Sequence, residues 1–269
     1  MDSRELILRE VFPNIAMRLK SSVSNLYGAM HHMMPPEKQE ESPEVRRLTA
    51  IWNHSYYQTI RTLNNLEAAP SLLDDTPYQT ENVDLIAFFA DLCGKTAPLV
   101  EAMELRFSFL CEGTAHITAA APRQLEQLFW NLLSNAMKYT APGGTITVSL
   151  RFEHQQAVLC VADTGCGIAP EAIDTIFEQY LHFEPRKIAQ GVGLGLALSR
   201  QIAQRHGGRL VVQSQAGVGT RVSVALPDRR TDSSTLQSPA LDYTGGFSPM
   251  LIGLADALPY TLYGPEQTD

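Results

Sequence analysis

Apolar or small residues recur at alternating steps of four and three over the first 33 residues of the chain. They are Leu8, Phe12, Ile15, Leu19, Ser22, Leu26, Ala29 and Met33. This spacing is typical of the seam of a coiled coil or a helical bundle. Pro13 lies inside the pattern, and proline removes a backbone hydrogen-bond donor. The sequence therefore predicts one long helix with an irregularity near this proline.

A second amphipathic helix is predicted after the Pro- and Glu-rich stretch 35–42. Ser42 followed by Pro43 is an N-cap with proline at the first helical position. The apolar side of this helix consists of Val45, Leu48, Trp52, Tyr56, Ile60, Leu63 and Leu66. Pro70 ends the helix. The sequence thus predicts a helical hairpin over residues 5–67, which we assign to a first domain of residues 1–70.

The hairpin has two apolar seams, and two amphipathic helices alone bury little surface. Pairing with a second copy into a four-helix bundle covers both seams, so we expect a homodimer. The alternative is that the hairpin packs on the C-terminal half of its own chain.

From about Asn82 the pattern changes to mixed helices and strands. Helices are predicted over residues 83–104 and 122–139, and a strand over residues 116–120. Runs rich in β-branched residues predict two strand pairs, 145–152 with 157–162 and 209–214 with 220–226. The expected fold class is α+β, with the helical hairpin followed by an α/β sandwich over residues 78–228.

The amino-acid composition changes again near the end of the chain. Residues 228–248 are polar and rich in Gly, Ser, Thr and Pro, which is typical of a linker. Residues 250–260 are apolar again, and we expect them to dock on the chain itself or on a partner. Residues 229–269 are therefore predicted to be a linker and a C-terminal tail.

Composition narrows the class of protein. The formal net charge of -8 and the lack of a basic stripe argue against a nucleic-acid partner. No apolar run approaches the roughly 20 residues that span a bilayer, and residues 1–30 lack the features of a signal peptide. We expect a cytoplasmic protein without a membrane partner. The four cysteines form no Cys-x-x-Cys pair, so reduced structural thiols are expected.

Four short blocks occur in order along the second domain. They are Asn131-Leu-Leu-Ser-Asn135-Ala-Met-Lys138-Tyr139, Asp163-Thr-Gly165-Cys-Gly167-Ile168, Gly191-Val192-Gly193-Leu194-Gly195-Leu196 and Gly217-Val-Gly219-Thr220. Each block alone is a weak signal, because a glycine cluster also serves turns. The four together, in this order, are specific.

The chemistry of the blocks favours ATP with Mg²⁺. Asn131, Asn135 and Lys138 fall on one face of the predicted helix, where amide oxygens suit Mg²⁺ and the lysine suits phosphates. Asp163 ends an apolar strand, where its carboxylate can accept a hydrogen bond from the adenine amino group. The glycines of the third block directly precede a predicted helix over residues 196–205, and helix N-termini bind anions.

The blocks resemble the N, G1, G2 and G3 boxes of the ATPase superfamily of gyrases, chaperones, histidine kinases and mismatch-repair proteins. Histidine kinases match best, over residues 78–227, with residues 177–183 in place of the phenylalanine box. The resemblance implies a Bergerat-type ATPase fold, with Asn135 as the metal ligand and Asp163 as the adenine contact. The cofactor-binding residues that it implies are Asn131, Asn135, Lys138, Tyr139, Asp163, Gly165, Gly167, Ile168, Gly191, Val192, Gly193, Leu194, Gly195, Leu196 and Thr220.

Asn131 separates the branches of this superfamily. Gyrase and mismatch-repair proteins carry a glutamate four residues before the metal asparagine, and here that residue is Asn131. A neutral amide cannot take the proton from an attacking water. We therefore expect phosphate transfer to a protein or plain binding, rather than efficient ATP hydrolysis or a nucleotide-driven clamp.

The first helix differs from the histidine kinases at the reacting centre. The best counterpart of their phosphoacceptor motif is Met17-Arg18-Leu19-Lys20-Ser21-Ser22. Met17 stands in place of the phosphoacceptor histidine, and a thioether has no basic nitrogen. Arg18 stands in place of the acidic residue.

We therefore expect an ATP-binding, histidine-kinase-like signalling protein of two-component type without ordinary autophosphorylation. It would act on a response regulator or another protein partner. One alternative is an active histidine kinase that uses His31, His32 or His54 as a non-standard acceptor. The other is an interaction scaffold that works without nucleotide.

Overall fold

The computed structural model describes residues 7–35, 38, 42–173, 194–230 and 248–264. The chain divides into two compact units. Residues 1–74 and 242–269 form one, called here the helical unit, and residues 75–241 form the other, the sheet unit. The last part of the chain therefore belongs with the hairpin.

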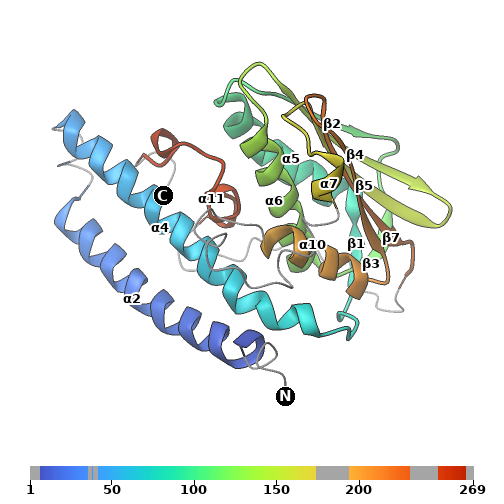
Figure 1. Cartoon of the computed structure of the whole chain (residues 1–269), viewed down its shortest axis with the longest axis horizontal. Coiled ribbons are helices and arrows are strands. Elements are labelled where there is room, and N and C mark those ends of the chain that lie inside the picture. The colour runs from blue at the N-terminus through green and yellow to red at the C-terminus, as the bar shows by residue number, and fades with distance from the viewer. Residues whose placement is uncertain (1–6, 36–37, 39–41, 174–193, 231–247, 265–269) are drawn as a thin grey trace. The chain divides into compact units, whose positions relative to one another are not determined.

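The helical unit contains the predicted hairpin (Figure 1). Its elements are the π-helical turn η1 (Ile7–Val11), α2 (Phe12–Met33), α4 (Pro43–Ala68) and the 3₁₀ turn η2 (Ala69–Leu73). Pro13 lies in the first turn of α2, directly after the π-helical turn, so the predicted irregularity is confirmed. Ser42 caps α4 by accepting a hydrogen bond from the backbone N–H of Val45 at 3.5 Å.

The two helices of the hairpin meet through aromatic side chains. The ring centroids of Tyr27 on α2 and Tyr56 on α4 lie 3.9 Å apart. Four large apolar residues of the predicted seam on α2 stay 47–66% exposed, and they are Ile15, Leu19, Leu26 and Met33. These four residues, called here the α2 stripe, follow the predicted seam, so an apolar face of the hairpin stays open to solvent.

Residues 248–264, called here the C-terminal segment, pack on α4. The segment contains α11 (Pro249–Leu254) and the 3₁₀ turn η3 (Tyr260–Leu262). Its buried side chains are Leu251, Leu254, Ala255, Leu258 and Tyr263. The rings of Tyr263 and Tyr57 lie 5.3 Å apart between centroids. The apolar segment predicted to dock thus does so on the second helix of its own chain.

Within the described part of the sheet unit, five strands form a mixed sheet in the order β2-β4-β5-β7-β6. The strands are β2 (Arg106–Cys111), β4 (Thr145–Glu153), β5 (Gln156–Asp163), β6 (Arg209–Gln215) and β7 (Gly219–Pro227). β2 runs parallel to β4, and the other neighbours are antiparallel. Both predicted strand pairs are confirmed, whereas β2 was not predicted. β1 (Glu81–Asp84) and β3 (Ile117–Ala120) form a separate pair.

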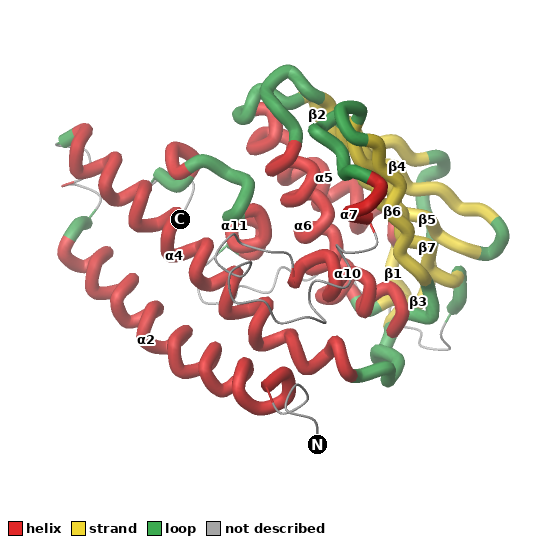
Figure 2. The backbone as a smooth tube through the Cα atoms, viewed as in Figure 1, coloured by secondary structure: helices red, strands yellow, loops and turns green. Residues whose placement is uncertain are grey.

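Three helices cover one face of this sheet (Figures 1 and 2). They are α5 (Leu85–Glu101), α6 (Pro122–Tyr139) and α10 (Leu194–Arg205). The helix predicted over residues 83–104 is confirmed, but α5 is shorter at both ends. Asp84 ends β1 and caps α5, because its carboxylate accepts from the N–H groups of Ile86 and Ala87. The bounds of α6 match the predicted ones.

The cysteines of the chain form no disulfide. All four cysteines are free thiols, and burial raises the pKa of Cys93 to about 12, which makes that thiol a poor nucleophile. Among the described helices, none combines the length and the apolar character that crossing a bilayer requires.

Candidate functional site

The motif residues of the sheet unit gather where α6 and β5 end. A Cβ added to Gly165 would lie 2.3 Å from the carbonyl oxygen of Tyr139. The backbone N–H of Cys166 donates to the same oxygen at 3.1 Å. The loop after β5 is thus held against the last residue of α6, and only glycine fits at position 165.

At Asp163, the last residue of β5, one carboxylate oxygen accepts two backbone hydrogen bonds, and the other accepts none from the described residues. Its Oδ1 accepts from the backbone N–H groups of Gly165 at 2.8 Å and of Thr220 at 3.2 Å. Burial raises the pKa of Asp163, and these two hydrogen bonds oppose that rise. No hydrogen bond from the described residues reaches Oδ2. This oxygen can therefore accept from an amino group of a ligand.

Two glycines with positive φ let neighbouring loops approach the same end of the sheet. A Cβ on Gly219 would lie 2.0 Å from the carbonyl oxygen of Asp163, and one on Gly167 would lie 2.0 Å from that of Gln215. Their φ angles are 139° and 64°. Any side chain at either position would push the loops apart.

Ser214 on β6 joins these loops, and sequence reasoning missed it. Its Oγ accepts from the N–H of Ile168 at 2.8 Å and donates to the carbonyl oxygen of Gly219 at 2.9 Å. It also lies 2.9 Å from Oγ1 of Thr220, its partner in the register of β6 and β7. The predicted pairing of these two strands was the signal that would have placed Ser214 opposite Thr220.

α6 contributes Asn131, Asn135 and Lys138, and they differ in what they touch. Asn131 is buried, and its Nδ2 donates at 3.2 Å to the carbonyl oxygen of Gly195, near the start of α10. Asn135 is half-buried and Lys138 is exposed. Within the described residues neither of these side chains makes a hydrogen bond or an ion pair, although Nζ of Lys138 lies 5.5 Å from the centroid of the Tyr139 ring. Asn131 therefore fixes α10, while Asn135 and Lys138 are open to a ligand.

The third glycine block is only partly described. Gly191, Val192 and Gly193, with residues 177–183, lie outside the described residues. Leu194 and Leu196 are half-buried in the first turn of α10, and Gly195 is buried. A Cβ on Gly195 would lie 3.1 Å from Oδ1 of Asn131, so a larger residue there would disturb the contact between α6 and α10.

The donor set fits ATP and Mg²⁺. Asp163 Oδ2 is a half-buried acceptor beside a glycine loop, and Asn135 has an unused amide. Among the described residues, no three His, Cys, Asp or Glu side chains gather to hold a metal. A magnesium ion at this site would thus depend on an amide oxygen, water and phosphate oxygens, which is a ligand set that Mg²⁺ accepts.

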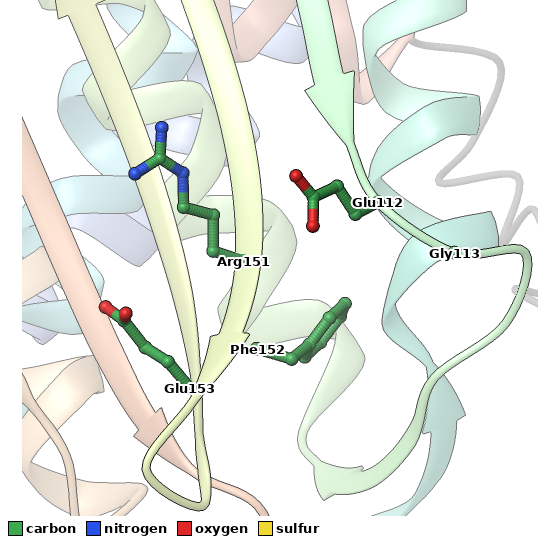
Figure 3. Close-up of a pocket in the computed structure, with 5 residues that line it drawn as sticks. All are labelled: Glu112, Gly113, Arg151, Phe152 and Glu153. Carbon is green, nitrogen blue, oxygen red and sulfur yellow. The ribbon is translucent and has the colours of Figure 1, made fainter.

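The motif end of the sheet contains a cavity of about 360 Å³, and its lining includes Asp163, Ser214 and Thr220. A second cavity, of about 630 Å³, is lined by Glu112, Gly113, Arg151, Phe152 and Glu153 (Figure 3). Glu153 pairs with Gln156 at the turn between β4 and β5, whereas Asp163 is at the far end of β5. The larger cavity is therefore at the opposite end of the sheet from the motifs.

The candidate phosphoacceptor histidines, and Met17 at the position of the usual phosphoacceptor, lie in the helical unit. Met17 is 61% exposed on α2. Nε2 of His31 lies 3.2 Å from Oδ1 of Asn53, and Nε2 of His54 lies 3.0 Å from the carbonyl oxygen of Ala255. His32 is exposed, and the described residues offer it no hydrogen bond.

Comparison with known proteins gives a family for the sheet unit. Residues 120–230 match the family described as histidine kinase-, DNA gyrase B-, and HSP90-like ATPase. The histidine protein kinase DivJ of Caulobacter vibrioides is 46% identical over 108 residues, which cover 39% of this chain and 18% of DivJ. The aerobic respiration control sensor protein ArcB of Escherichia coli K12 is 29% identical over 222 residues, 79% of this chain and 28% of ArcB. The sensor histidine kinase RppB of Synechocystis is 28% identical over 221 residues, 80% of this chain and 48% of RppB.

Solved structures share the fold. Full-length ShkA in complex with AMPPNP gives a TM-score of 0.64 at 19% identity, covering 83% of this chain and 47% of that one. The histidine kinase AdeS of Acinetobacter baumannii gives a TM-score of 0.51 at 19% identity, covering 74% of this chain and 98% of that one. The chain spans between about a fifth and a half of the length of the curated relatives named above.

The sheet unit is thus an ATPase domain of the class that histidine kinases share with gyrase B and HSP90. Within that class, residues 120–230 resemble the catalytic core of sensor histidine kinases, because the relatives named above that match this region are histidine kinases and sensor proteins. The predicted fold class is confirmed, since a helical N-terminal region precedes a mixed α/β sheet of this ATPase type.

Proposed function

We propose that this chain binds Mg²⁺-ATP in the sheet unit and acts on a partner protein as a histidine-kinase-like component of two-component signalling. The observation that supports this proposal most is the hydrogen bonding of the Asp163 carboxylate. Its Oδ1 is used by two backbone N–H groups, while Oδ2 has no hydrogen bond within the described residues. An open, half-buried acceptor suits the exocyclic amino group of adenine.

The other site residues have complementary roles in this proposal. The amide oxygen of Asn135 binds Mg²⁺, which would neutralise phosphate charge when it is present. By the family resemblance, Lys138, Tyr139 and Thr220 would surround the phosphates. Gly191 and Gly193, which lie outside the described residues, would join them. Asn131 holds the start of α10 in place through Gly195 and cannot serve as a base for water attack. ATP as a ligand also fits the cytoplasmic location expected from the sequence.

The helical unit would pair with a second copy through the α2 stripe. Four exposed apolar residues along one helix form the kind of patch that marks a protein interface. We expect Leu26→Glu to shift the protein toward monomer in multi-angle light scattering, because a charge in an apolar seam is costly. Leu110→Glu, which adds the same charge at an exposed position of the sheet unit, is the control. A wild-type chain that is monomeric at micromolar concentration would contradict the pairing.

The phosphoacceptor position argues for action on a partner instead of autophosphorylation. Met17 is well exposed on α2, yet its thioether cannot accept a phosphoryl group, and Arg18 supplies no base. The partner would be a response regulator or another protein that receives or loses phosphate, or that binds only the nucleotide-loaded form.

Calorimetry with Mg²⁺-ATP tests the nucleotide part of the proposal. The wild-type chain should bind, and Asn135→Ala and Asp163→Ala should each bind at least tenfold more weakly, in line with the loss of a metal ligand or a buried acceptor. Asp91→Ala, at a half-buried position of α5 where the carboxylate pairs only with Lys95 among the described residues, is the matched control. Equal affinity in all four proteins would rule out the assigned site.

A second candidate function is favoured by the exposure of His32. His31 and His54 already use Nε2 inside the helical unit, whereas His32 is exposed and makes no hydrogen bond to the described residues. If the chain is an active kinase with a non-standard acceptor, acid-labile label from γ-labelled ATP should appear at His32 and vanish in His32→Ala. A chain that binds no ATP at all would instead be an interaction scaffold.

A further inference from the structure

The face of the sheet turned away from α5, α6 and α10 gathers arginines from strands that are far apart in the sequence. Side chains alternate between the two faces along each strand, and Val148 and Leu150 of β4 are buried on the helix side. The arginines of the other side, called here the arginine face, are Arg106 on β2, Arg151 on β4, Arg209 on β6 and Arg221 on β7. All four are exposed. Figure 3 shows Arg151 and Glu153 pointing away from Phe152, and Glu153 is the only carboxylate that the residues of the five strands place on this face.

Three of these arginines surround a row of small side chains. The row consists of Ser149, Cys160 and Ser223, which are register partners on β4, β5 and β7. Arg151 lies two residues beyond the row on β4, and Arg209 pairs with Ala225, two residues beyond the row on β7. Arg221 lies two residues before the row on β7, on its other side. The strand pairing itself therefore places three guanidinium groups around one patch of the sheet.

The polar side chains of this patch are donors that lack acceptors. Among the described residues, Arg151 and Arg209 make no side-chain hydrogen bond or ion pair, and Arg221 reaches only the cysteine sulfur of the row, from Nη1 at 3.5 Å. The hydroxyls of Ser149 and Ser223 likewise have no hydrogen-bond partner within the described part of the chain. Guanidinium groups bind carboxylates through two parallel hydrogen bonds. The patch therefore suits a ligand that carries several carboxylates.

Apolar side chains lie at both ends of the row. Leu110 on β2 pairs with Ser149, and Val211 on β6 pairs with Ser223. They are 56% and 44% exposed. Protein interfaces combine arginines with apolar side chains, whereas contacts to nucleic acids are mostly to phosphate and sugar. The net charge of -8 also repels a nucleic acid or an anionic membrane, because either would extend beyond the patch. The arginine face thus favours a short acidic segment of a protein.

We infer that the arginine face binds an acidic segment of a partner protein, with carboxylates at Arg151, Arg209 and Arg221 and apolar side chains at Leu110 and Val211. The inference rests on the proposed function, since it supplies a surface for the partner protein named there, but it does not involve the nucleotide. The row with its two apolar ends crosses five strands, about 19 Å at the usual strand spacing. A segment of roughly six extended residues reaches from one end to the other.

The test uses the full chain and a fluorescent peptide in which glutamates alternate with serines between two terminal leucines. Arg151→Gln with Arg221→Gln should bind this peptide about tenfold or more weakly than wild type, because two charge-assisted contacts are lost. Arg46→Gln with Arg47→Gln removes the same charge from exposed positions of α4, and it should keep the wild-type affinity. Fluorescence anisotropy measures the affinities, and a peptide with glutamine in place of glutamate should bind wild type weakly.

The apolar ends have a test of their own. Leu110→Ser with Val211→Ser should weaken binding of the peptide with terminal leucines, because apolar contact area is lost. The same variant should bind a peptide with terminal serines as wild type does. Arg209→Gln, on a different strand from the other two arginines, should also weaken binding of the acidic peptide, and it tests the inference if the double arginine variant does not fold.

The outcomes separate this inference from the proposed function. Absence of peptide binding by wild type, or equal affinity of wild type and Arg151→Gln with Arg221→Gln, overturns the inference. Duplex DNA and phosphatidylserine vesicles are tested in parallel, and tighter binding of either one than of the peptide also overturns it. A chain that binds the peptide but no ATP in calorimetry keeps the inference and overturns the nucleotide part of the proposed function.

Discussion

Asn53, in the middle of α4, donates from its side-chain Nδ2 to the backbone carbonyl oxygen of Tyr263, which lies 210 residues later in the sequence, at 3.0 Å. Its Oδ1 lies 3.2 Å from Nε2 of His31 on α2. Asn53 is fully buried. One amide therefore ties both helices of the hairpin to the C-terminal segment.

Replacing Asn53 with Leu, which has a similar size, should destabilise the helical unit. The carbonyl oxygen of Tyr263 would stay buried without its partner, at a cost of about 1–3 kcal/mol. Urea denaturation of the full chain, with hydrogen exchange followed in peptides of α4, would measure the loss. Ser55→Ala is the control, because that exposed hydroxyl bonds only to Ile51 of its own helix. Equal stability of the two variants would mean that the amide contributes nothing to docking.

Replacing Asp256 and replacing Arg61, the two partners of an ion pair, should lower the stability of the fold by different amounts. Nε of Arg61 lies 3.2 Å from Oδ2 of Asp256, with side-chain exposures of 8% and 33%. Burial lowers the pKa of Arg61, while the charge of Asp256 opposes that change.

Asp256→Ala leaves the buried guanidinium without its counter-charge, whereas Arg61→Met removes the charge and keeps much of the volume. We expect Asp256→Ala to lower the unfolding free energy by about 1–3 kcal/mol more than Arg61→Met does. Chemical denaturation of both variants checks the order. An equal or reversed order would show that solvent already screens the pair.

Asp163→Asn should bind ATP poorly without losing stability. The amide oxygen of Asn can still accept from Gly165 and Thr220, but the new NH₂ group would face the adenine amino group. The pKa of Asp163 is raised in the folded chain, so ionisation of this carboxyl favours the unfolded state. The stability that the protonated carboxyl of Asp163 contributes is lost as the pH rises through the pKa that this group has in the folded chain.

Without nucleotide, Asp163→Asn should therefore melt at or above the wild-type temperature near neutral pH. This difference should narrow as pH falls through the folded pKa, because the wild-type carboxyl then becomes neutral. Thermal melts of both proteins over a pH series measure it. A variant that melts well below wild type at neutral pH would show that the negative charge stabilises the fold.

Met17→His alone should not create a working phosphoacceptor. The exposed position on α2 would gain a nucleophilic nitrogen, but Arg18 would still stand where a carboxylate should orient the ring and accept its proton. Met17→His with Arg18→Glu replaces both functions and should give acid-labile label from γ-labelled ATP. Label at residues 14–22 of the wild-type chain would contradict the alignment, and label in the single variant would show that the carboxylate is dispensable.

The sequence predicted most of what depends on near neighbours in the chain. The four-three spacing gave both helices of the hairpin, and Ser42 before Pro43 gave the start of α4, because caps and helix faces depend on residues three or four apart. The order of the four blocks also predicted the ATPase fold and brought Asp163, Gly165 and Tyr139 into one site.

Only the tertiary structure decided the features that depend on distant pairing. β2 was missed because its six residues take their place by pairing in parallel with β4, across a separation of 39 residues. Ser214 accepts a hydrogen bond from the N–H of Ile168, 46 residues earlier in the sequence, and a motif cannot place these two residues in space. The docking of the C-terminal segment on α4 was likewise fixed by Asn53, Tyr57 and Arg61. An apolar run in the sequence indicates that the segment is buried. Which surface covers the segment depends on the shape and hydrogen bonds of the folded chain.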